Sequence, residues 1–157
     1  MTPSPRRHRL TAAILVIAAA LSCHAAEPTA TDGPRSDSYV QHAHDIAVQQ
    51  PGPHEGLGTT TAYPFFEAAQ GFDIVFRQRA LHRGATIGTH RNDKDEIYYV
   101  LSGRGELLLD GKRSQVGAGD AILTRNGSTH GLKQLGDEDL VIIVVYPKRK
   151  DPALTRP

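Results

Sequence analysis

The fold is decided by a stretch that begins Gly84-Ala-Thr-Ile-Gly-Thr-His90-Arg-Asn92-Asp-Lys-Asp-Glu96 and ends Gly119-Asp-Ala-Ile-Leu-Thr-Arg-Asn-Gly127-Ser-Thr-His130. Glycines divide it into short apolar segments, which is typical of β-strands joined by tight turns. Two histidines and a glutamate within it are residue types that bind divalent metals. The stretch therefore predicts a metal pocket inside a small β-barrel.

The sequence is β-rich from residue 71 onward. The expected strands cover residues 72–77, 96–101, 106–109, 112–116, 121–124, 129–135 and 140–146. Asp110-Gly111, between two of these segments, is a strong hairpin-turn signal. No long segment has helical periodicity. Seven or eight short strands with glycine-rich turns predict an all-β fold, a sandwich or a jelly roll.

Two motifs in residues 84–134 resemble those of the cupin family. The usual first motif is Gly, five residues, His-x-His, three or four residues, Glu, six residues and Gly. Its places are taken by Gly84, His90, Asn92, Glu96 and Gly103. The usual second motif is Gly, five residues, Pro-x-Gly, two residues, His, three residues and Asn. Its places are taken by Gly119, Arg125, Gly127, His130 and Gln134. The resemblance covers about residues 71–147 and implies a cupin-type jelly-roll β-barrel, or double-stranded β-helix.

His90, Glu96 and His130 are the expected ligands of a divalent metal ion. Imidazole and carboxylate donors together suit Fe, Mn, Zn or Ni, so the identity of the metal stays open. Asn92 has the parity of His90 on a strand and stands in place of the second cupin histidine. Asn92 and Tyr98, which shares the face of Glu96, are the expected substrate contacts. In the alternative interpretation, the two histidines line a pocket that binds no metal.

Other polar residues are expected outside this pocket. His54 lies in a Pro/Gly loop, where a role in the site is not expected. His82 follows the first barrel strand and is a weaker candidate to face the pocket. Arg77 and Arg79 fall on the face opposite the Phe72 stripe, so they are predicted to face solvent.

Ile97, Tyr99 and Leu101 form an apolar outer face on the expected central strand. A lone barrel would leave part of that face in water. We therefore expect an N-terminal arm or a second subunit to cover it. Cupins of this size are commonly dimers, so the resemblance also implies a homodimer.

Residues 1–25 have the pattern of a secretory signal peptide, with basic Arg6, Arg7 and Arg9 before an apolar run at 10–21. Cleavage after Ala25 would leave a periplasmic or secreted protein with no integral membrane span. Alternatives are a lipoprotein anchored through Cys23 and export by the twin-arginine route. Residues 26–38 are expected to be a disordered linker, 39–70 an N-terminal arm, 71–147 the barrel and 148–157 a C-terminal tail.

The charge and cysteine content exclude several classes of function. Cys23 is the only cysteine, so the mature chain would have neither a disulfide nor a thiol nucleophile. Removal of residues 1–25 takes three arginines from the 18 basic residues and leaves 15 against 17 acidic ones. Such a chain has no basic surface for nucleic acid.

We expect an exported cupin that binds a divalent metal and acts on a small oxygen-rich metabolite: a sugar, a sugar acid or a carboxylate. The alternative is a non-catalytic envelope protein that binds a small ligand or metal, so whether the chain is an enzyme stays open.

Overall fold

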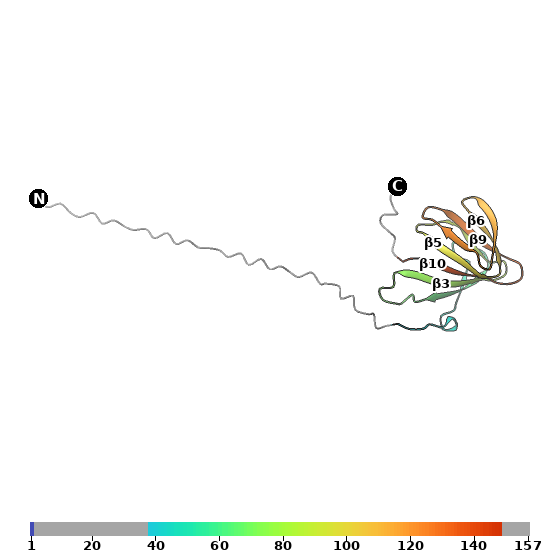
Figure 1. Cartoon of the computed structure of the whole chain (residues 1–157), viewed down its shortest axis with the longest axis horizontal. Helices are drawn as coiled ribbons and strands as arrows, with labels where there is room; N and C mark the ends of the chain where they lie inside the picture. Colours follow the sequence, from blue (N-terminus) through green and yellow to red (C-terminus); the bar gives the residue numbers. More distant parts are fainter. Residues whose placement is uncertain (2–37, 149–157) are drawn as a thin grey trace. The chain divides into compact units, whose positions relative to one another are not determined.

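The structure is a computed structural model that describes Met1 and residues 38–148, and in that part it is almost entirely β (Figure 1). The strands are β1 (Val48–Pro51), β2 (Thr59–Phe65), β3 (Ile74–Leu81), β4 (Thr86–Arg91), β5 (Glu96–Ser102), β6 (Arg104–Leu109), β7 (Lys112–Gly117), β8 (Ala121–Thr124), β9 (Thr129–Leu135) and β10 (Leu140–Pro147). One 3-10 turn, η1 (Ala43–Asp45), precedes them. The prediction of an all-β fold is confirmed.

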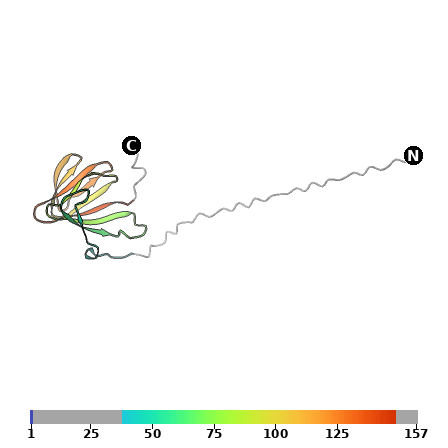
Figure 2. The same cartoon turned by 180° about the vertical axis from the view of Figure 1, so that it is seen from behind.

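The strands form two antiparallel sheets, seen from both sides in Figures 1 and 2. The six-stranded sheet has the order β1-β2-β3-β10-β5-β8, and the four-stranded sheet has the order β4-β9-β6-β7. Strands distant in the chain are neighbours in both sheets, as the pairing of β4 with β9 illustrates. This arrangement is a jelly-roll barrel, and it brings residues far apart in sequence to one interior.

The core lies between the two sheets. Its fully buried apolar side chains come from both of them, including Val100, Leu140 and Ile142 on one sheet and Leu132 on the other. On β5, Glu96, Tyr98 and Val100 point inward and are buried, whereas Ile97, Tyr99 and Leu101 remain 44–45% exposed. The apolar outer face predicted from the sequence is therefore present.

The turn between β6 and β7 shows how local sequence sets this topology. Asp110 and Gly111 have φ angles of 48° and 80°, which are the left-handed values of a two-residue hairpin turn. Leu109 then pairs with Lys112 across the turn. The Asp-Gly signal in the sequence correctly predicted this hairpin.

Residues 39–70, which we expected to form an arm, contribute two strands to the six-stranded sheet. β2 pairs with β3 from Thr60 to Phe65, and β1 pairs with β2. The predicted signal peptide and tail lie outside the described residues, apart from Met1 and Lys148, and so does the linker apart from Ser38. Within the described part, no helix is long and apolar enough to cross a bilayer.

Candidate metal centre

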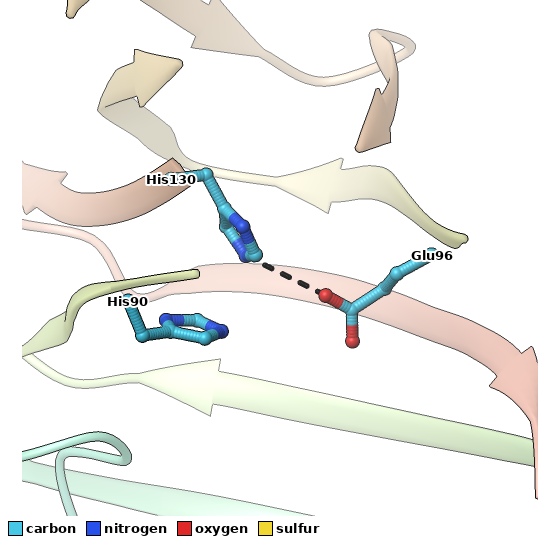
Figure 3. A group of neighbouring side chains, drawn as sticks. All are labelled: His90, Glu96 and His130. Atoms are coloured by element: carbon cyan, nitrogen blue, oxygen red, sulfur yellow. Dashed lines mark ion pairs between the residues drawn. The ribbon is translucent and has the colours of Figure 1, made fainter. Parts of the chain in front are cut away.

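His90, Glu96 and His130 converge inside the barrel, and Figure 3 shows both imidazole rings beside the carboxylate. His90 near the end of β4 is paired in register with His130 on β9, whereas Glu96 begins β5 of the other sheet. One potential ligand atom from each residue lies within 4.8 Å of the other two. His130 Nε2 is 3.5 Å from Glu96 Oε2. The packing of the two sheets thus assembles a two-nitrogen, one-oxygen donor set.

The hydrogen bonds around these side chains fit a divalent ion. His90 Nδ1 donates to the Gly88 carbonyl at 2.9 Å, which leaves its Nε2 lone pair available to a metal. His130 is fully buried, and its Nδ1 has no hydrogen-bond partner among the described residues. Two histidines and one carboxylate with open positions also match the ligand set of many non-haem metal sites.

Burial favours the metal-binding form of His130 and opposes that of Glu96. It lowers the pKa of His130 to about 4, with further lowering by the nearby charges of His90 and His54. His130 is therefore a neutral imidazole at neutral pH, and metal binding requires that state. Burial also raises the pKa of Glu96, and hydrogen bonds from Asn92 and Tyr98 oppose that rise.

Asn92 and Tyr98 both contact the cluster. Asn92 is 6% exposed, and its amide Nδ2 donates to Thr124 Oγ1 at 2.7 Å and to Glu96 Oε2 at 3.3 Å. The Thr124 hydroxyl donates its hydrogen to the main-chain carbonyl of Glu96, so its oxygen acts as the acceptor for the Asn92 amide. Tyr98 is buried with its hydroxyl 3.1 Å from His130 Nε2. Asn92 therefore orients the carboxylate, and the substrate contacts expected of both residues stay a prediction.

His54 also belongs to this site, so the expectation that it plays no part is wrong. Its ring stacks on that of His90, with centroids 3.4 Å apart and planes 7° from parallel. Its loop lies against β4 so closely that a Cβ on Gly88 would come 1.9 Å from the His54 carbonyl oxygen. His54 and Glu55 have left-handed φ angles of 55° and 60°, a strained conformation that often occurs at functional sites.

The prediction that Arg77 and Arg79 face solvent is also wrong. Arg79 is only 5% exposed, and it donates to Thr60 Oγ1 at 2.6 Å and to Gln50 Oε1 at 3.3 Å. On β3 the odd-numbered residues face inward, because Leu81 is fully buried, whereas the even-numbered Ile74 on the other face is 44% exposed. The two arginines share this parity, so they are directed into the barrel.

A cavity of about 70 Å³ lies beside Glu96 and the two arginines. It is lined by Pro53, His54, Arg77, Arg79, Ile87, Glu96, Tyr98, Val144 and Tyr146. His82, the weaker sequence candidate, is not among them, because its ring bonds Thr61 Oγ1 and Asp139 Oδ2, each at 2.9 Å. Of the three candidate metal ligands, Glu96 lines this cavity, so the cavity adjoins the metal centre on its carboxylate side and places two guanidinium groups there.

The fold and this site define a small jelly-roll protein with a candidate metal centre. Residues 79–146 match the family model of the cupin domain, so this part of the chain is a cupin domain, as its two motifs predicted.

Several known proteins are similar to the chain. It is 33% identical over 80 residues to an oxalate-binding protein of Thermotoga maritima, covering 50% of this chain and 66% of the relative. It is 31% identical over 70 residues to the pectin degradation protein KdgF of Dickeya dadantii, covering 44% of this chain and 64% of the relative. The chain thus spans slightly less than two thirds of each relative's length. A crystal structure of a predicted oxalate decarboxylase from Thermotoga maritima superposes with a TM-score of 0.63 and 26% identity over 69% of this chain and 98% of that one.

Proposed function

We propose that this cupin binds a divalent metal ion through His90, Glu96 and His130 and uses it to hold a small acidic, oxygen-rich metabolite. The observation that carries the proposal is the convergence of three ligand atoms within 4.8 Å of one another. The hydrogen bond of His90 Nδ1 to Gly88 supports it, because it aims the other ring nitrogen at the site. One similar protein is named for binding oxalate and another for degrading pectin. Oxalate is a small acid, and pectin is an acidic polymer.

The chain's own residues prepare the site for such a ligand. The amide of Asn92 holds Glu96, and burial keeps the Tyr98 phenol protonated by raising its pKa well above the usual value. A ligand oxygen would accept the Tyr98 proton in place of its present partners, His130 and Glu96. The ring of His54 stacks on one face of the His90 ring. A bound divalent ion would polarise a ligand oxygen at this place.

Metal analysis of the purified protein tests the proposed ligands. We expect about one ion per chain, and a large loss of metal when His90, Glu96 or His130 is replaced by an uncharged residue that does not ligate. His44→Gln is the matched control, because that ring is 79% exposed and lies outside the cluster. An equal metal content in the control and the three site variants would refute the assignment. The same measurement identifies the metal among Fe, Mn, Zn and Ni.

A non-catalytic binding protein is the second candidate. The observation that favours it concerns proton transfer: Tyr98 is held in its protonated form, and Glu96 would be occupied by the metal. Neither group is then available as a general base. Turnover assays with sugar acids and small carboxylic acids distinguish the two candidates, since a binding protein would retain these ligands unchanged.

We propose, from the sequence pattern alone, that residues 1–25 direct export to the periplasm or medium. Sequencing of the mature N-terminus would test this, with Ala26 as the expected first residue. We also propose a homodimer that covers Ile97, Tyr99 and Leu101, which are 44–45% exposed in the single chain. Light scattering on the native protein and on Tyr99→Lys tests it, because a charge in a dimer interface should produce monomers.

A further inference from the structure

Arg77 and Arg79 form a pair of positive charges in the wall of the cavity, next to the candidate metal ligands. Alternation along β3 puts both on the inward parity of Leu81. Both line the cavity together with Glu96 and Tyr98. No part of the proposed metal site accounts for them, because a guanidinium group cannot bind a cation.

Within the described part of the chain, one carboxylate forms an ion pair with these two arginines, and it is largely exposed. Arg79 is 95% removed from solvent, and its hydrogen-bond acceptors, Thr60 and Gln50, are neutral. Arg77 reaches one carboxylate, that of Glu67, at 3.7 Å, and the Glu67 side chain is 68% exposed. Among the described residues, Arg77 Nε is buried without any hydrogen-bond partner. Burying charge is costly unless it is paired, so this wall is expected to pair with an anion.

The two guanidinium groups also act on each other. Burial and then the charge of Arg77 lower the pKa of Arg79, although arginine stays protonated in proteins. Two adjacent cations favour an anion that can bond both, and the planar guanidinium fork matches a carboxylate geometrically. A neutral sugar would leave the repulsion in place.

We propose that Arg77 and Arg79 form a carboxylate-binding subsite, so that the ligand of this cupin is a small carboxylic acid held between the arginine pair and the His90–Glu96–His130 centre. The proposal rests on the proposed function and adds to it the chemical class of the ligand and two residues that determine specificity. The cavity of about 70 Å³ limits the size of the part enclosed. One water molecule needs roughly 10–15 Å³ of cavity volume, so this cavity has room for only a few water-sized groups. A two- or three-carbon acid therefore fits, and a disaccharide does not.

Calorimetric titration with oxalate tests the subsite. We expect the metal-loaded wild type to bind oxalate, and Arg77→Gln and Arg79→Gln to bind it roughly tenfold to a hundredfold more weakly, the range for one lost charge-assisted bond. Arg83→Gln is the matched control, because Arg83 is 78% exposed and pairs with the surface residue Asp137. Imidazole, a neutral metal ligand, should bind equally well to all four metal-loaded proteins.

The outcomes separate this proposal from the metal proposal. Retained metal and unchanged oxalate affinity in both cavity variants would overturn the subsite and leave the metal centre intact. If the wild type holds no metal, the proposed function fails, and oxalate binding to the metal-free protein then decides whether the arginine pair alone is a receptor. Arg77 is less buried than Arg79, so Arg77→Gln remains informative if the other variant does not fold.

Discussion

Acidification should destabilise the metal-free protein through His130. Its pKa is lowered from 6.5 to about 4 in the folded state, first of all by burial, and its side chain is not exposed at all. Above pH 6.5 neither state holds the proton, and the folded state has its full stability. As the pH falls below 6.5, His130 becomes protonated in the unfolded chain but stays neutral in the folded chain. Stability is therefore lost until the pH reaches about 4, where the folded chain also binds the proton.

The size of the loss follows from the gap between the two pKa values of His130. One pKa unit corresponds to about 1.4 kcal/mol, so the complete effect is on the order of 3 kcal/mol, of which about 2 kcal/mol is reached at pH 5. Glu96 acts in the opposite sense, because its raised pKa lets the folded state bind a proton more readily as the pH falls. His54, whose pKa is lowered, adds to the effect of His130.

A comparison with His130→Gln isolates the contribution of this ring. Urea unfolding of both proteins in EDTA, at several values between pH 7.5 and pH 5, gives the free energy of unfolding directly. The wild type should lose about 2 kcal/mol more than the variant over this range. His44→Gln, at an exposed position, should retain the wild-type slope. Parallel curves for wild type and His130→Gln would refute the reasoning, and so would a wild type that gains stability on acidification.

Two substitutions test the packing around the site. Gly88→Ala should cost about 1–3 kcal/mol and displace the His54 loop, because the new Cβ would lie 1.9 Å from a carbonyl oxygen. Gly117→Ala, whose nearest neighbour would be 3.9 Å away, should cost far less in the same denaturant assay. Leu132→Ala removes a 98% buried core side chain and should lower the free energy of unfolding by about 2–5 kcal/mol. Leu57→Ala, at a 70% exposed position, should change it by less than about 0.5 kcal/mol, and equal losses in the two leucine variants would contradict the assigned core.

The strands from β5 to β10 were predictable because their signals are local. Alternation of period two, and turn residues such as Asp110-Gly111, act between neighbours in the chain, and the hairpin pairing of β6 with β7 follows from them. The convergence of His90, Glu96 and His130 was predictable for another reason. Two motifs with fixed spacing identified the family, and the family's fold implied that the motifs meet.

The arginine wall and the His54 loop were not predictable from such signals. β1 consists of Val48–Pro51, all four residues of which are exposed, so its sequence gave no apolar pattern. Yet Gln50 on this strand and Thr60 on β2 are the acceptors that let Arg79 lie inside the barrel. The Phe72 stripe therefore indicated the wrong inward face for β3. The density of glycine and proline in residues 51–58 was the one available signal of a tightly packed loop near the site.

The replacement of the second cupin histidine by Asn92 connects these observations. Asn92 supplies no imidazole, and its amide nitrogen donates to Glu96 and Thr124, so a bound ion would have one histidine fewer than in the usual cupin motif and more positions open to ligand oxygens. A divalent ion and two guanidinium groups bring four positive charges to the site, against the one negative charge of Glu96. A dicarboxylate would reduce that excess by two, whereas a neutral sugar would leave it unchanged. If the metal site is as proposed, an anionic ligand is favoured both by the missing imidazole and by the inward arginine pair. Metal removal should therefore weaken oxalate binding more than either arginine substitution alone.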